Sequence, residues 1–350
     1  MSYEWPLDPE DLFVERYPQM LRSGLTATDI REVRAAVVEM WPDAPGGWVY
    51  EWSKLAARYA ADGRHDRAAA AYGWAKFPCL ADEAKHEALD RQLAQYLLAA
   101  PGFGVDFERR VLRLPYRDGT TDVPVHLFTP PELPDAAPVL LASGGVDTWK
   151  MDLHSLFVFF AMQTGVRLLA FDIPGTGESA VPMRGDEGGQ LVDGLIEAAR
   201  KLGGGKVAHL GISMGGYYSA RSGLSGAVDA ALVLGGPVEH AFTEDRPWRY
   251  GMAGIIGNAL GFDAPPTDAA QAEALHGFSL RPLLDKDDNA PMLVINGADD
   301  VHVPQHDTLV FAGRRGTEVA LLPGTGHCAT SELAQVVPRM TGWLSATLAS

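Results

Sequence analysis

Two different spacings of apolar residues divide the chain. Up to about residue 99, apolar and aromatic side chains recur every three or four positions, as in Trp48, Trp52, Leu55 and Tyr59. This is the period of a helix that buries one face. It predicts helices at about 26–40, 48–61, 66–77 and 81–99, separated by Gly-Gly, Asp-Gly and proline turns.

The pattern changes after the sequence Pro101-Gly102-Phe103-Gly104. Short apolar runs at 109–114 and 123–128 flank an Asp-Gly turn and predict an antiparallel hairpin. Strands then alternate with helices. The expected strands are 139–142, 166–171, 207–210, 230–234, 292–296 and 317–322, and the expected helices are 151–163, 186–201, a helix after 213, 305–311 and 332–348. Uniformly apolar strands that alternate with helices indicate a parallel sheet covered by helices on both faces. We therefore expect an α/β fold whose element order is that of an α/β-hydrolase.

One interruption breaks this alternation. Residues 235–289 are rich in aromatic and small residues and show no strand alternation. A segment of this length is too long for a simple connection and is more often a functional lid. The predicted organisation is a cap-like helical region at 1–104, a hydrolase core at 105–235 and 290–350, and a helical lid at 236–289.

Composition narrows the classes of function. A chain of 350 residues with 47% apolar residues can bury a large core, and its net charge of −16 argues against nucleic acid or an anionic membrane as a partner. The start lacks a signal-peptide pattern, and no apolar run approaches the length of a membrane span. Two cysteines, Cys79 and Cys328, provide neither a disulfide framework nor a metal-site spacing. We expect a cytoplasmic protein without metal or cofactor that acts on a small-molecule substrate.

The sequence Gly211-Ile212-Ser213-Met214-Gly215 is the most informative motif. It follows an apolar strand and precedes a helix, which is the context that a G-x-S-x-G nucleophile elbow requires. Small flanking residues permit the sharp turn, and the helix N-terminus favours negative charge beside the serine. The alternative is an ordinary glycine-rich turn, since so short a pattern recurs by chance. Ser213 is the predicted nucleophile.

The other two residues of a triad should follow in the order acid, then histidine. After the strand 292–296 stand Asp299 and Asp300, and the Gly-x-x-Asp-x-x-Val-Pro spacing favours Asp300, with Asp299 as the alternative. After the last strand, His327 lies on a glycine-flanked loop. His209, His302 and His306 lie inside a strand or near the acid loop and are interpreted as structural.

An oxyanion hole is expected from backbone N–H groups. One donor is Met214, the residue after the nucleophile, and the second is Gly145 or Val146, on a glycine-rich loop at 143–150. Candidate substrate contacts are Asp147, Trp149, Lys150 and Tyr217, although a solvated loop is an equal alternative for Asp147 and Lys150. The turn at 171–179 is expected to be structural, with Glu178 or Ser179 bracing the elbow.

These motifs together resemble one branch of the α/β-hydrolases. The branch includes dihydroxypseudo-oxynicotine hydrolase, the fermentation-respiration switch protein and hydrolases that shorten polyketide chains. The resemblance rests on the segments 143–150, 172–179, 211–217 and 324–328. It implies hydrolysis of a C–C bond next to a ketone, or of an ester, in an aromatic or polyketide-like substrate. It also implies that the N-terminal helices help to cover the site, and often a homodimer. Lys150-Met151-Asp152 departs from the acidic pair expected after that lysine.

Three functions are compatible with these residues. The first is a serine hydrolase. The second uses the same pocket for dehydration or cyclisation of a polyketide intermediate, with His327 moving protons and Ser213 only binding an oxygen. The third is a regulatory binding protein with a vestigial site, which an intact triad disfavours. The sequence does not separate the first two.

Overall fold

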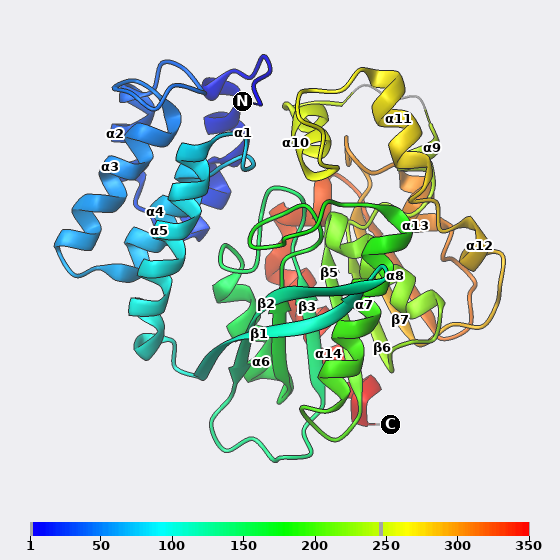
Figure 1. Cartoon of the computed structure of the whole chain (residues 1–350). Coiled ribbons are helices and arrows are strands. Elements are labelled where there is room, and N and C mark those ends of the chain that lie inside the picture. The colour runs from blue at the N-terminus through cyan, green and yellow to red at the C-terminus, as the bar shows by residue number, and fades with distance from the viewer. Residues whose placement is uncertain (1–2, 245–247, 350) are drawn as a thin grey trace. The chain divides into compact units, whose positions relative to one another are not determined.

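The computed structural model describes residues 3–244 and 248–349 (Figure 1), which form two compact units. One unit contains the residues up to 104 together with 248–266, and the other contains 105–247 and 267–350. The predicted lid, 236–289, is therefore divided between the two units. Three of its residues, 245–247, lie outside the described residues.

The helical unit is built from an N-terminal set of helices. They are α1 (Pro9–Arg22), α2 (Ala27–Ala36), α3 (Trp48–Ala61), α4 (His65–Ala75), α5 (Glu83–Ala99) and the short η1 (Ala100–Gly102). The helix α1 has no counterpart among the predicted ranges. Thr26 begins α2 with a capping box, in which its side chain and that of Asp29 each accept from the other's backbone N–H. The core of the unit includes Trp48 and Trp52, both fully buried.

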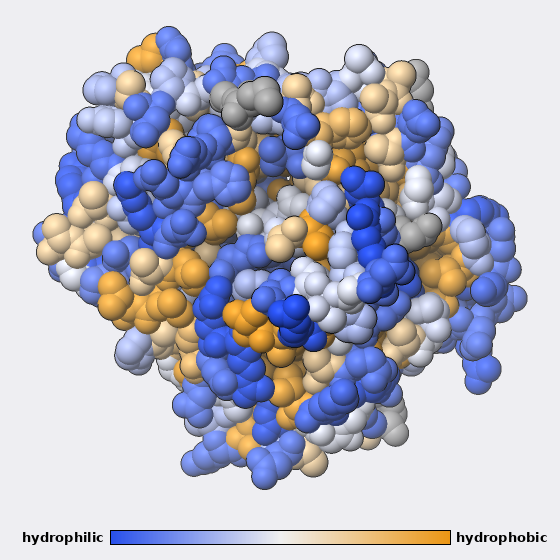
Figure 2. All heavy atoms as spheres, viewed as in Figure 1, coloured by the Kyte–Doolittle hydropathy of each residue, from blue (hydrophilic) through white to orange (hydrophobic). Residues whose placement is uncertain are grey.

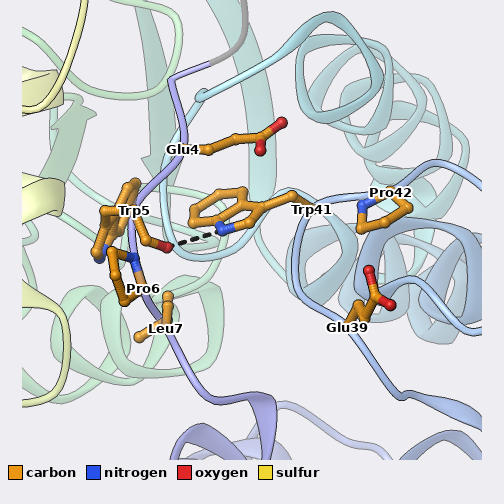
Figure 3. Close-up of a pocket in the computed structure, with 7 residues that line it drawn as sticks. All are labelled: Glu4, Trp5, Pro6, Leu7, Glu39, Trp41 and Pro42. Carbon is orange, nitrogen blue, oxygen red and sulfur yellow. Dashed lines mark hydrogen bonds between the residues drawn. The ribbon is translucent and has the colours of Figure 1, made fainter.

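The segment 248–266 joins this unit through close contacts of α10 (Met252–Ala259) with the chain start. A Cβ atom on Gly254 would lie 2.3 Å from the Trp5 ring, so only glycine permits this approach. A shallow pocket of about 350 Å³ lies beside Trp5 and Trp41, whose indole N–H donates to the Trp5 carbonyl at 2.9 Å (Figure 3). No predicted site residue lines this pocket.

The second unit contains an eight-stranded sheet. In chain order the strands are β1 (Asp106–Tyr116), β2 (Gly119–Thr129), β3 (Val139–Ser143), β4 (Arg167–Phe171), β5 (Val207–Ile212), β6 (Ala230–Leu234), β7 (Met292–Gly297) and β8 (Thr317–Leu322). Their order in the sheet is β1-β2-β4-β3-β5-β6-β7-β8. The pairs β1–β2 and β2–β4 are antiparallel and the rest are parallel. Strands β3, β5, β6 and β7 each pair with a strand on either side, and their burial on both faces explains their apolar sequences.

Helices cover both faces of this sheet (Figure 1). One pair is α7 (Gly185–Arg200) and α8 (Met214–Leu224), and the other is α6 (His154–Thr164) and α14 (Leu333–Ala349). The shorter helices of this unit are α9 (His240–Thr243), α11 (Asp268–His276), α12 (Arg281–Leu284), α13 (Gln305–Leu309) and η2 (His327–Glu332). The predicted α/β-hydrolase architecture with N-terminal helices is confirmed.

The surface composition and the helix lengths show whether the described residues include a helix that could span a membrane. On the face drawn in Figure 2, hydrophilic residues predominate and hydrophobic residues are interspersed among them. Among the described residues, no helix combines the length and the apolar character that a membrane span needs.

Candidate active site

Ser213 lies in a strained turn between β5 and α8. Its backbone has φ 55° and ψ −127°, a conformation that L-residues rarely adopt and that is typical of functional turns. The turn is held because Ser213 N–H donates to the Leu234 carbonyl at 2.8 Å and Gly216 N–H donates to the Ser213 carbonyl at 2.7 Å. The serine therefore stands at the carboxyl end of the sheet, at the N-terminus of α8.

The glycines around Ser213 are sterically required. A Cβ atom on Gly211 would lie 2.0 Å from the Gly215 carbonyl oxygen, and one on Gly215 would lie 2.4 Å from the Gly144 oxygen. On Gly216 it would meet the Gly236 Cα at 2.5 Å. These contacts are all to backbone atoms, which cannot rotate away. The glycine spacing that indicated an elbow thus has a direct packing cause.

The structure brings Ser213, His327 and Asp300 together. His327 Nε2 lies 2.8 Å from Ser213 Oγ, and His327 Nδ1 lies 2.7 Å from Asp300 Oδ2. His327 follows β8 and stands before Cys328 and Ala329, which both have positive φ. These distances match the arrangement of a Ser-His-Asp triad, in which the acid holds the imidazole in one tautomer.

The carboxylate of Asp300 is fully hydrogen-bonded. Oδ1 accepts from the backbone N–H groups of His302 (2.7 Å) and Val303 (3.1 Å), and Oδ2 accepts from the Asn296 amide (2.9 Å) as well as from His327. Asp299, the alternative acid, has an exposed side chain. Geometry therefore selects Asp300 as the partner of His327.

The interaction between His327 and Asp300 shifts the pKa of each side chain toward its charged form. Burial opposes protonation of His327, but the Cys328 sulfur and the Asp300 carboxylate favour it, so the pKa of His327 is raised well above its ordinary value. The Asp300 carboxylate lies 2.7 Å from Nδ1, so it stabilises the protonated imidazole both by charge and by a hydrogen bond. Burial also opposes ionisation of Asp300, yet His327 and the Asn296 hydrogen bond leave its pKa lowered.

The loop after β3 passes directly beside Ser213. A Cβ atom on Gly145 would lie 2.9 Å from Ser213 Cβ and 3.0 Å from its Oγ. However, Gly145 N–H already donates to the Thr148 carbonyl at 3.0 Å. In the described part of the chain, the N–H groups of Val146 and Met214 have no such backbone acceptor. Of the two residues predicted as the second donor, Val146 has the available N–H.

Lys150 does not lie where a substrate contact requires it. Its side chain is fully buried, and its ammonium donates to Asp172 at 2.5 Å and contacts Glu178 at 2.8 Å. Arg109 pairs with Glu178 from β1 at 2.5 Å. Burial lowers the pKa of Lys150, but the two carboxylates outweigh it and raise the pKa overall. The expectation of a solvated or substrate-facing Lys150 is corrected: the residue ties the loop 143–150 to the turn after β4.

The other predicted contact residues also have structural partners. The Trp149 indole donates to the Val146 carbonyl at 3.1 Å. The backbone N–H of Trp149 donates to Asp152, the single acid that stands where a pair of acids was expected after Lys150. Thr148 donates to Asp147 at 3.1 Å. Trp149 and Asp147 therefore shape the loop, and a contact of either with substrate stays a prediction.

Tyr217 lies one helical turn after Ser213, within an aromatic cluster. Its ring makes edge contacts with Phe242 at 5.7 Å and Phe278 at 5.3 Å between centroids. Both phenylalanines belong to the predicted lid. These two residues of the predicted lid are therefore packed against α8, the helix that begins directly after Ser213.

The remaining histidines near the site have other environments. His209 is buried inside β5, where its Nδ1 lies 3.0 Å from Ser222 Oγ and burial lowers its pKa to about 3. The His302 ring lies edge-on to His327, with centroids 5.4 Å apart. One further residue of the site, Asn296, was not predicted from the sequence, although its amide donates to Asp300. The available signal was a polar residue near the end of an otherwise apolar strand.

Comparison with known proteins identifies relatives of this chain among curated hydrolases. The chain is 26% identical to an alpha/beta hydrolase, pydG, of an Acremonium species, over 59% of this chain and 55% of that protein. It is 27% identical to the hydrolase ORFZ of Pyricularia oryzae, over 59% and 56% of the two chains. The chain thus spans about half the length of these curated relatives.

A solved structure and a family model cover more of the chain. The structure of 2,6-dihydroxy-pseudo-oxynicotine hydrolase superimposes with a TM-score of 0.77 and 20% identity, over 95% of each chain, which shows a shared fold. The model described as "Esterase FrsA-like" matches residues 38–346. Because this match spans most of the chain and agrees with the resemblance predicted from the motifs, the chain belongs to the FrsA-like family of α/β-hydrolases.

Proposed function

We propose that this chain is a serine hydrolase in which Ser213 attacks a carbonyl carbon of its substrate. The observation that carries the proposal is the unbroken line of hydrogen bonds from Ser213 Oγ through His327 to Asp300. As Oγ bonds to carbon, its proton passes to His327 Nε2. Asp300 then stabilises the imidazolium through Nδ1–H.

Attack on the carbonyl places negative charge on its oxygen. The N–H groups of Met214 and Val146 are the proposed donors, and loss of one such donor typically costs about 2.7–4 kcal/mol of barrier. Collapse of the tetrahedral intermediate breaks the bond to the leaving group, which takes the proton from His327. A water molecule deprotonated by His327 then cleaves the acyl-enzyme and restores Ser213.

The proposed substrate is a bulky aromatic or polyketide-like compound cleaved at a C–C bond next to a ketone, or at an ester. The aromatic cluster of Tyr217, Phe242 and Phe278 beside α8 favours such a substrate. Likeness to a hydrolase of 2,6-dihydroxy-pseudo-oxynicotine points the same way. A carbon leaving group departs as an enolate and must be protonated at carbon, for which His327 is the acid within reach.

The first experiment tests the nucleophile. Wild type and Ser213→Ala are treated with a fluorophosphonate probe and compared by intact mass, with Ser219→Ala as a control that removes a buried serine hydroxyl from the same helix. We expect one adduct on wild type and on Ser219→Ala, and none on Ser213→Ala. An unlabelled wild type would contradict a nucleophilic Ser213 and favour either the dehydratase or cyclase alternative or a vestigial site.

The second experiment tests the bond that is broken. The protein is incubated with aryl esters and with β-diketones, and the products are followed by mass. Addition of water with cleavage of a β-diketone supports C–C hydrolysis. Turnover of aryl esters alone defeats it, and loss of water or an isomeric product favours the dehydratase or cyclase alternative.

A further inference from the structure

Two histidines and a glutamate gather outside the candidate active site, where α9 approaches α13. His240 Nδ1 lies 2.8 Å from Glu244 Oε1, and the His240 and His306 rings have centroids 5.0 Å apart. One ligand atom from each of the three residues lies within 4.8 Å of the other two. His240 is half-buried, whereas Glu244 and His306 are exposed.

The backbone holds the two histidines in this relation. Asp307 follows His306 directly, and its buried carboxylate accepts from the N–H groups of Val238 (3.1 Å), His240 (2.6 Å) and Ala241 (3.1 Å). The start of α9 is therefore fixed to α13 through one side chain. The position of His240 relative to His306 follows from this anchor and not from surface side chains alone.

The donor set has a recognisable chemistry. A histidine–glutamate pair four residues apart is, by itself, an ordinary surface interaction of about 0.3–0.5 kcal/mol. A second imidazole from a separate helix turns it into two nitrogens and one carboxylate oxygen, which is a zinc ligand set that leaves a fourth position for water. Ligand atoms on a tetrahedral zinc ion lie roughly 3.4 Å apart, so closure needs movement of about an ångström by the exposed Glu244 and His306 side chains.

We propose that His240, Glu244 and His306 form a site for a divalent transition-metal ion of the zinc class. The ion would join α9, at the base of the lid, to α13, which follows the loop that carries Asp300. Binding would thus brace the connection between lid and acid loop. Nitrogen ligands favour Zn²⁺, Co²⁺ or Ni²⁺ over Mg²⁺ and Ca²⁺, which prefer oxygen.

The test uses the full chain without a histidine tag. Zn²⁺ binding is measured by calorimetry, and Co²⁺ is added as a spectroscopic probe because its visible absorption reports coordination geometry. We expect one ion per chain in wild type, with at least a tenfold weaker affinity in His240→Ala, Glu244→Gln and His306→Ala. Zn²⁺ should also raise the melting temperature of wild type but not of His306→Ala.

Two exposed histidines elsewhere provide matched controls. His86→Ala and His276→Ala should bind Zn²⁺ as wild type does, because neither lies in the cluster. Wild-type affinity in His306→Ala would overturn the site, as would a wild type that binds no Zn²⁺. Loss in His240→Ala alone, with Glu244→Gln and His306→Ala unchanged, would also overturn a three-ligand site.

Discussion

The side-chain amide of Asn296 donates a 2.9 Å hydrogen bond to Asp300 Oδ2, the same oxygen that accepts from His327 Nδ1. The carbonyl oxygen of that amide accepts from Cys328 N–H at 3.0 Å. Asn296 is itself fully buried. One side chain at the end of β7 therefore fixes both the acid and the loop that carries the histidine.

We expect Asn296→Ala to lower kcat with little change in KM. A hydrogen bond to a charged group contributes about 1.5–3 kcal/mol, which corresponds to roughly a tenfold to hundredfold loss of rate. Steady-state kinetics on a reactive aryl ester would measure this. Asn289→Ala, which removes an amide from the segment that leads into the same strand, is the control and should keep wild-type kcat. An equal loss in both variants would indicate general destabilisation instead of a positioning role.

Local sequence predicted the elements because their causes are local. Buried parallel strands are apolar on both faces, and the elbow needs glycine at Gly211, Gly215 and Gly216 for backbone clearance alone. Both features are visible in a few consecutive residues. The fold class followed from the order of the elements along the chain, and the same order predicted the three residues that the structure brings within hydrogen-bond distance, Ser213, Asp300 and His327.

Contacts between distant segments were not predictable in the same way. Lys150 is held by Asp172, 22 residues later, and nothing in the loop sequence distinguishes a buried lysine from a substrate-facing one. The grouping of residues 248–266 with the N-terminal helices likewise depends on how closely Gly254 approaches Trp5. Both contacts join segments that are distant in the sequence. The hydrophobic pattern of neither segment changes when the contact is present, so the pattern cannot predict the contact.

The raised pKa of His327 predicts the pH dependence of hydrolysis. The base must be neutral to accept the Ser213 proton, so activity is lost as pH falls through its pKa. Because Asp300 raises that pKa, the acidic limb of kcat/KM should lie above the ordinary histidine value of about 6.5. Asp300→Asn should move the limb to lower pH while reducing kcat on the order of 10⁴-fold. Asp299→Asn should leave the limb and most of the rate unchanged, and a limb shifted by Asp299→Asn would mean that the acid is misassigned.

Lys150→Met should destabilise the second unit strongly. It leaves the buried carboxylate of Asp172 without its cation, whereas Glu178 keeps its ion pair with Arg109, and breaking a buried ion pair typically costs about 3–5 kcal/mol. Urea unfolding measures the change in the free energy of unfolding. Arg281→Ala removes an exposed ion pair with Asp285 and should change stability by no more than about 1 kcal/mol. Similar stabilities of the Lys150 variant and wild type would contradict a structural role for this network.

Gly145→Ala tests the approach of the oxyanion loop to the nucleophile. The new methyl group would lie 2.9 Å from Ser213 Cβ, which is closer than real Cβ contacts allow, and 3.0 Å from its Oγ. Ser213 cannot easily retreat, because its turn is fixed at both ends by backbone hydrogen bonds. Either the loop or the serine must shift, and a displacement of about 1 Å can cost on the order of a hundredfold in rate.

The rate of fluorophosphonate labelling reports this shift directly at Ser213. Gly326→Ala is the matched control, since it lies next to His327, has a φ of −89° and would place its Cβ in open space. It should label at nearly the wild-type rate, whereas Gly145→Ala should label at least tenfold more slowly. Wild-type labelling of Gly145→Ala would mean that the loop moves away from Ser213 without cost, and the proposed alignment of Val146 N–H with the substrate oxygen would then lose its support.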